Sequence, residues 1–167
     1  MDPEKIIAGK KVLIVDDEKE VLEMLLELLD VCKVDAAQSF DEAKQMLEKN
    51  SYDVAILDIM GVRGFDLLEI AKNRGIPALM LTAHALTEEN LKKSAKEGAA
   101  YYAPKDEMSK IGLFVADVIE AQSKKKNAWV KWFERLGNFY DKRFAGPNWR
   151  EKEKEFWEKK LSEYRGL

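Results

Sequence analysis

The chain has 167 residues, a net charge of −3 and a hydrophobic content of 46%, which is enough for one domain with an appendage. It has one cysteine, Cys32, which excludes a disulfide-stapled secreted scaffold and favours a reducing, cytoplasmic location. No apolar run approaches the roughly 18 residues of a membrane span, and the N-terminal residues do not resemble a signal peptide.

The charge is divided unevenly along the chain. Residues 1–123 carry 15 basic and 24 acidic side chains, whereas residues 124–167 carry 13 basic and 7 acidic ones. All four tryptophans and ten of the sixteen aromatic residues lie in this second part. The shift predicts an N-terminal arm at residues 1–9, an acidic domain at residues 10–122 and a basic aromatic tail at residues 123–167.

The acidic part alternates two patterns. Short runs rich in branched apolar residues are typical of strands buried on both faces, and apolar residues at three- and four-residue spacing predict helices. Because strand and helix alternate five times, we expect an α/β fold with a parallel sheet covered by helices. In chain order the strands are expected at 12–15, 31–37, 54–57, 78–81 and 100–103, and the helices at 21–29, 39–47, 65–73, 87–97 and 108–121.

Polar residues follow the ends of four of these strands. Asp16 and Asp17 follow the first strand, Asp58 the third, Thr82 the fourth and Lys105 the fifth. Right-handed crossovers bring the carboxyl ends of parallel strands to one edge, where open α/β sheets bind ligands. Three neighbouring carboxylates repel one another unless a cation joins them, and oxygen ligands suit Mg²⁺. One aspartate is then expected to accept a phosphoryl group, whose charge Mg²⁺ and Lys105 offset.

Four motifs occur in order along this part: VLIVDDE at 12–18, AILDIM at 55–60, LMLTAHA at 79–85 and GAAYYAPK at 98–105. Together they resemble the receiver domain of two-component response regulators, over about residues 10–122. The resemblance implies a flavodoxin-like, doubly wound (βα)5 sheet with strand order 2-1-3-4-5. It also implies a histidine kinase or phosphotransfer protein as phosphodonor, and a downstream protein partner.

The resemblance also implies roles for individual residues. Asp58 is expected to be the phosphoacceptor. Asp17, Asp58 and the backbone carbonyl of Met60 are expected to bind Mg²⁺ directly, and Asp16 through water. A receiver of this kind accelerates its own phosphorylation and dephosphorylation and is not a turnover enzyme.

Three further residues are assigned by the same resemblance. Thr82 is expected to be the switch hydroxyl that moves onto the phosphoryl group, and Lys105 pairs with the phosphate. Tyr102 is expected to be the aromatic switch whose rotamer follows the state of the site. The single histidine, His84, is expected to be a surface loop residue without a catalytic role.

Two departures from the family pattern motivate an alternative. The loop at residues 58–64 is about two residues shorter than usual and lacks the usual proline, and Asp106 stands where the family has proline after the site lysine. The alternative is a pseudo-receiver, a constitutive interaction or dimerisation module whose site is unused. A DNA-binding regulator acting through the basic tail is a third and weaker alternative, because glutamates interleave the tail's basic residues.

The tail predicts two helices. Aromatic residues recur at helical spacing from Trp129 to Phe144, and after a break at Gly146 and Pro147 a second helix is expected from Asn148 to Tyr164. The pattern indicates a helical hairpin, although the first helix could instead continue the last receiver helix. So many aromatic side chains need another surface. Three surfaces remain open: the chain's own receiver, a second copy in a homodimer, or a different protein.

Overall fold

The computed structural model describes residues 2–83 and 86–163, so the expectations for His84 and Tyr164 lie outside the described residues. Five strands form one parallel sheet in the order β2-β1-β3-β4-β5. This order confirms the flavodoxin-like fold predicted above. The strands are β1 (Lys11–Val15), β2 (Lys33–Ala37), β3 (Val54–Leu57), β4 (Ala78–Thr82) and β5 (Tyr101–Pro104).

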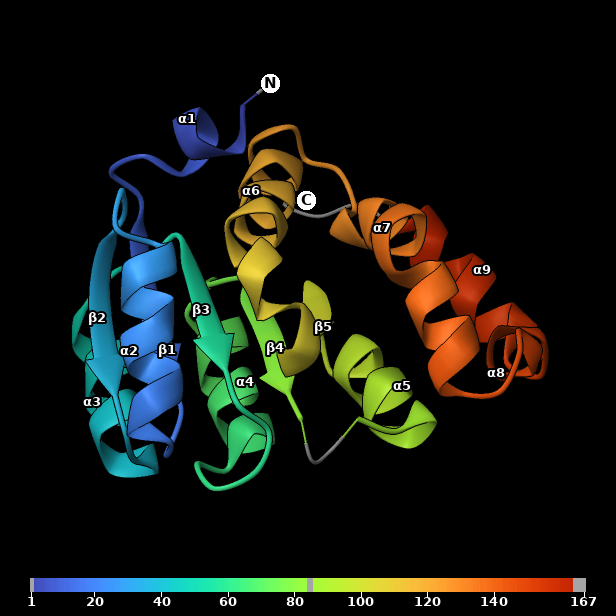
Figure 1. Cartoon of the computed structure of the whole chain (residues 1–167), viewed down its shortest axis with the longest axis horizontal. Coiled ribbons are helices and arrows are strands. Elements are labelled where there is room, and N and C mark those ends of the chain that lie inside the picture. Colours follow the sequence, from blue (N-terminus) through green and yellow to red (C-terminus); the bar gives the residue numbers. More distant parts are fainter. Residues whose placement is uncertain (1, 84–85, 164–167) are drawn as a thin grey trace.

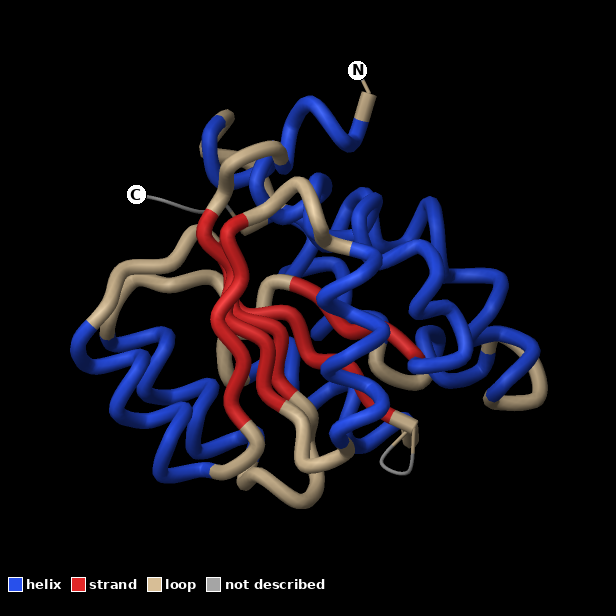
Figure 2. The backbone as a smooth tube through the Cα atoms, turned by 60° about the vertical axis from the view of Figure 1, so that its left-hand side comes forward, coloured by secondary structure: helices blue, strands red, loops and turns tan. Residues whose placement is uncertain are grey.

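Helices cover both faces of the sheet. Helices α2 and α6 lie against one face, and α3 and α4 lie against the other (Figure 1); Figure 2 shows the strands between the two helical layers. Among the described residues, no helix is both long and apolar enough to cross a membrane. The helices of this part are α1 (Pro3–Ile7), α2 (Lys19–Leu28), α3 (Phe40–Lys49), α4 (Gly64–Asn73), α5 (Glu88–Lys96), the 3-10 helix η1 (Lys105–Lys110) and α6 (Ile111–Ser123).

Local chemistry explains where several elements begin. The Ser39 hydroxyl accepts a hydrogen bond from the Glu42 N–H, and the Thr87 hydroxyl accepts one from the Asn90 N–H. These side chains satisfy N–H groups that the first turn of a helix leaves without a partner. Helices α3 and α5 therefore begin directly after the capping residues.

The predicted start of the last receiver helix is wrong. The last receiver helix begins at Ile111, because Met108 lies in η1, where Glu107 (φ −106°, ψ 19°) departs from helical geometry. The N-terminal arm contains the short helix α1, whose Ile7 is buried. Helix α1 packs against α6, and a Cβ added at Gly112 of α6 would lie at an ordinary van der Waals distance, 3.6 Å, from the Ile7 side chain.

The tail folds into three helices, α7 (Ala128–Arg143), α8 (Asn148–Glu151) and α9 (Lys154–Ser162). The prediction of one helix after Gly146 and Pro147 is wrong, because Glu153 (φ −117°, ψ 32°) leaves helical geometry and separates α8 from α9. The four tryptophans are at most 4% exposed. Their rings contact one another and neighbouring phenyl and phenol rings, as between Trp129 and Trp132, 4.9 Å apart.

The tail lies on the edge of its own sheet, beside β5 (Figure 1). The Trp129 indole N–H donates to the Ala99 carbonyl at 3.0 Å, and the Trp132 indole N–H donates to the Tyr102 carbonyl at 2.6 Å. The Tyr140 hydroxyl also donates to the Tyr102 carbonyl, at 3.3 Å. The sequence leaves three surfaces open for the tail's aromatic face. In the structure, the chain's own receiver covers that face.

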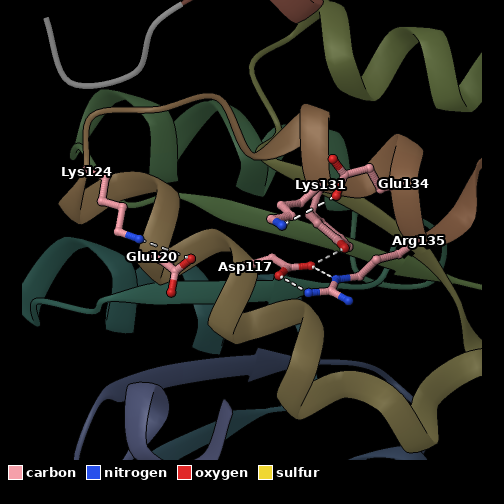
Figure 3. Close-up of polar contacts among 7 residues, drawn as sticks. Asp117, Glu120, Lys124, Lys131, Glu134 and Arg135 are labelled. Atoms are coloured by element: carbon pink, nitrogen blue, oxygen red, sulfur yellow. Dashed lines mark hydrogen bonds and ion pairs between the residues drawn. The ribbon is translucent and has the colours of Figure 1, made fainter. Parts of the chain in front are cut away.

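A buried carboxylate joins the tail to the receiver (Figure 3). Asp117 of α6 is 7% exposed and accepts two hydrogen bonds from the Arg135 guanidinium of α7, at 2.5 and 3.0 Å. The Tyr101 hydroxyl of β5 donates to the same carboxylate at 2.8 Å. A bidentate arginine–carboxylate pair fixes the relative orientation of the two side chains as well as compensating their charges. Strand, receiver helix and tail helix are thus tied together by one side chain.

Replacing Arg135 with methionine tests this connection. Arg135→Met leaves the Asp117 carboxylate buried with one neutral donor, so the free energy of unfolding is expected to fall by about 2 kcal/mol. Adding Asp117→Asn removes the uncompensated charge and is expected to restore at least half of the loss. Urea unfolding followed by tryptophan fluorescence measures both values. Equal stability of the single and double variants would contradict this account.

Candidate functional site

Four of the predicted polar residues meet at the carboxyl edge of the sheet. The Lys105 ammonium lies 2.8 Å from an Asp16 oxygen and 3.7 Å from an Asp58 oxygen. The residues Asp16 and Asp58 are at most 5% exposed, and Thr82, at the end of β4, is 1% exposed. Thr82 is in register with Pro104, the residue before Lys105. The neighbouring strands thus bring two carboxylates, an ammonium group and a hydroxyl to one edge.

Electrostatics makes this group of carboxylates unusual. Burial raises the pKa of Asp58 to about 7, and the charges of Asp16 and Asp17 act in the same direction, against Lys105. Burial also raises the pKa of Asp16, although its hydrogen bond to Lys105 opposes the shift. Burial and neighbouring negative charges thus destabilise the ionised form of these carboxylates. A further cation binds such a group favourably, because it offsets both the lost solvation and the repulsion among the carboxylates.

Lys105 stays charged at this site. Burial alone lowers the pKa of its ammonium group, but the hydrogen bond to Asp16 and the charges of Asp58 and Glu18 outweigh burial and raise the pKa. The pairing with Glu18, at 3.4 Å, was not foreseen. Its only signal in the sequence is the position of Glu18 directly after the two aspartates.

The short loop after Asp58 needs two glycines. Gly61 has φ +86°, and a Cβ there would overlap the Asp17 carboxylate. A Cβ at Gly64 would overlap the backbone carbonyl oxygen of Asp58. Glycine therefore lets this shortened loop approach the acidic residues closely. Met60, whose carbonyl was predicted to bind metal, lies in this loop with its side chain 55% exposed.

The acidic residues fit a divalent cation. Asp16, Asp17 and Glu18 each offer a carboxylate oxygen, and these oxygens lie within 4.8 Å of one another. The donor set consists of oxygen atoms alone, as Mg²⁺ prefers. The Asp58 carboxylate is not part of this group of three, but it lies close to it, because the Lys105 ammonium contacts both Asp16 and Asp58.

Tyr102, the predicted aromatic switch, points away from solvent. It is fully buried, with its ring 5.8 Å from the ring of Tyr140 in the tail. Burial raises the pKa of its hydroxyl, although the backbone of Thr87 donates a hydrogen bond to it and opposes the shift. Tyr102 therefore contacts both the tail and the start of α5.

Comparison with known proteins places these residues in a family. The sequence model of the response regulator receiver domain matches residues 12–112. A two-component response regulator of Arabidopsis thaliana is 35% identical over 108 residues, which are 61% of this chain and 17% of that protein. The heme response regulator HssR of Staphylococcus aureus is 40% identical over 76 residues, 42% of this chain and 34% of that protein. The chain matches about a third or less of the length of these relatives.

Solved structures agree with this placement. A CheY-like receiver domain from Methanospirillum hungatei has a TM-score of 0.57 and 27% identity, covering 68% of this chain and 98% of that one. A receiver domain protein from Clostridium thermocellum has a TM-score of 0.61 and 28% identity, covering 68% and 97%. With its matching sequence model, its strand order and its clustered acidic edge, the chain belongs to the response regulator receiver family of two-component signalling.

Proposed function

We propose that this protein is a two-component response regulator in which Asp58 accepts a phosphoryl group and the change at the site controls how the tail is held. The observation that carries the proposal is the buried Asp58 carboxylate beside Asp16 and Lys105. The phosphodonor is a histidine kinase or a phosphotransfer protein. The proposal includes a cytoplasmic location, where the Cys32 thiol stays reduced, and autodephosphorylation without turnover of an external substrate.

The reaction transfers a phosphoryl group from a histidine nitrogen of the donor to a carboxylate oxygen of Asp58. An Asp58 carboxylate oxygen forms a bond to phosphorus, the phosphorus–nitrogen bond of the donor phosphohistidine breaks, and the bonding electrons leave with the imidazole nitrogen, which takes a proton from water. Asp16, Asp17 and Asp58, with the Met60 carbonyl, would hold Mg²⁺. When bound, Mg²⁺ supplies positive charge that lowers repulsion between the carboxylates and the incoming phosphoryl group.

The residues around Asp58 then respond to new negative charge. Phosphorylation adds about −1.5 to −2 charge, and the Lys105 ammonium, now shared by three carboxylates, moves toward it. The Thr82 hydroxyl donates a hydrogen bond to a phosphoryl oxygen. Such a local change biases a two-state element rather than reshaping the whole fold.

The tail is the element that Tyr102 contacts. The Tyr102 ring packs on the Tyr140 ring, and the Tyr102 backbone carbonyl accepts hydrogen bonds from Trp132 and Tyr140. A rotamer change of Tyr102 would therefore alter packing directly beneath α7. This contact supports a response read out by the tail, or by a protein partner that binds where the tail lies.

Phosphorylation of Asp58 is tested by intact mass after incubation with Mg²⁺ and a small-molecule phosphodonor. We expect a gain of one phosphoryl group, unchanged in the exposed control Asp66→Asn and absent in Asp58→Asn. A folded, Mg²⁺-binding protein that gains no mass, either from this donor or from a panel of phosphorylated histidine kinases, would instead support the pseudo-receiver alternative.

Tail control is tested by fluorescence, since all four tryptophans lie in α7–α9. Adding Mg²⁺ with a beryllofluoride phosphate mimic is expected to shift the tryptophan emission of the native chain but not of Asp58→Asn. Thermal stabilisation measured in the same samples shows that the site is occupied. Stabilisation with an unchanged spectrum would rule out control of the tail.

The raised pKa of Asp58 predicts a pH dependence of stability. Because the folded-state pKa of about 7 lies above the ordinary value of 3.8 for an aspartate, the folded protein binds this proton more tightly, and stability falls as pH rises from about 4 to about 7. Asp58→Asn removes that loss. Without divalent cations it is expected to be more stable than the native chain by about 4 kcal/mol at pH 8 and about 2 kcal/mol at pH 5. Urea unfolding at each pH measures this difference, and a difference independent of pH would contradict the assignment.

A further inference from the structure

The tail is a unit held together by its own contacts. Asn127 caps α7 by accepting a hydrogen bond from the Trp129 N–H at 2.9 Å, and its side-chain amide donates to the Lys160 carbonyl in α9. Asp141 of α7 accepts a hydrogen bond from the Trp149 indole of α8 at 2.8 Å. Helices α7–α9 can therefore change position together without losing the bonds among them.

The receiver surface that contacts the tail makes ion pairs with it as well as aromatic contacts. Beyond the bonds to β5 and Asp117, Lys92 of α5 pairs with Glu153 at 2.8 Å, and Glu88 pairs with Lys152 at 2.9 Å. The tail is basic and the receiver acidic, so the two parts attract each other. Every copy of the chain carries both halves of this interface.

The connection between α6 and α7 stores strain. At residues 124–126 the Lys126 N–H donates to the Ala121 carbonyl and the Lys125 N–H to the Gln122 carbonyl, the pattern that usually ends with a left-handed glycine. Here the left-handed residue is Lys125, with φ +54°. Residues 113–136 contain neither glycine nor proline, so no helix-breaking residue enforces the turn.

We propose that this turn is a hinge through which two copies of the chain exchange tails, so that α7–α9 of each copy cover the β5 edge of the other. Opening relieves the left-handed conformation at Lys125, and closing onto a second copy restores every contact of the interface. Exchange of identical elements is a low-cost route to a two-fold dimer, and strained short hinges favour it. The proposal does not depend on phosphorylation of Asp58.

Cross-linking between chains tests the exchange, in a Cys32→Ser background. Lys92→Cys and Glu153→Cys proteins are mixed, unfolded in urea, refolded together at high concentration and treated with a short bis-maleimide. The dimer fraction from size-exclusion chromatography is expected to contain the covalent Lys92→Cys–Glu153→Cys pair. The double variant in one chain is the positive control. Lys33→Cys on β2, at the opposite edge of the sheet, mixed with Glu153→Cys measures background. A monomer at every concentration, or a dimer that cross-links no more than background, overturns the proposal.

A hinge variant gives an independent measurement. Lys125→Gly removes the strain that opening relieves, so opening of each hinge becomes less favourable by about fivefold. Because the dimer has two hinges, its dissociation constant is expected to rise about 25-fold. Lys124→Gly removes the same charge at a residue with φ −92° and is expected to have a smaller effect. Equal effects of the two variants, measured by light scattering over a concentration series, would overturn the role of Lys125.

Discussion

An edge strand of a parallel sheet exposes backbone carbonyls that no neighbouring strand satisfies. In this chain β5 is such a strand. The carbonyl of Tyr102 in β5 and that of Ala99, two residues before the strand, accept hydrogen bonds from the tail's indole and phenol groups. Tryptophan and tyrosine suit this role, because each combines a large apolar surface with one donor. Since β5 leads directly to Lys105, the covered edge and the acidic site depend on the same short strand.

The receiver fold and its acidic edge could be predicted because they depend on local pattern and on topology. Buried runs such as Val12–Val15 are strands by composition, and parallel strands with right-handed crossovers bring their carboxyl ends together. Asp16, Asp58, Thr82 and Lys105 therefore meet once the strand order is known. The roles proposed for them rest on the resemblance to the family and on the electrostatics of a buried carboxylate.

Other features could not be predicted, since they join residues far apart in the chain. Asp117 and Arg135 each look like solvent-exposed charges on separate helices until α6 and α7 pack together. The break between α8 and α9 falls among residues with high helix propensity, so tertiary packing decides it. The pairing of Glu18 with Lys105 likewise needs the fold, because 87 positions separate the two residues.

Tyr102 contacts the tail through its backbone carbonyl and through its ring, and a change at the acidic site would affect these two contacts differently. Its carbonyl belongs to the backbone of β5, which pairing with β4 holds in place, so this acceptor for Trp132 and Tyr140 stays in position when side chains rearrange. The Tyr102 ring is fully buried against the Tyr140 ring, so a rotamer change of Tyr102 would have to move Tyr140, because dense interiors do not absorb such changes. A signal at Asp58 would therefore weaken or strengthen the docking of the tail without removing its backbone anchors. Transfer of the tail to a second copy depends more on the hinge at Lys125 than on the site.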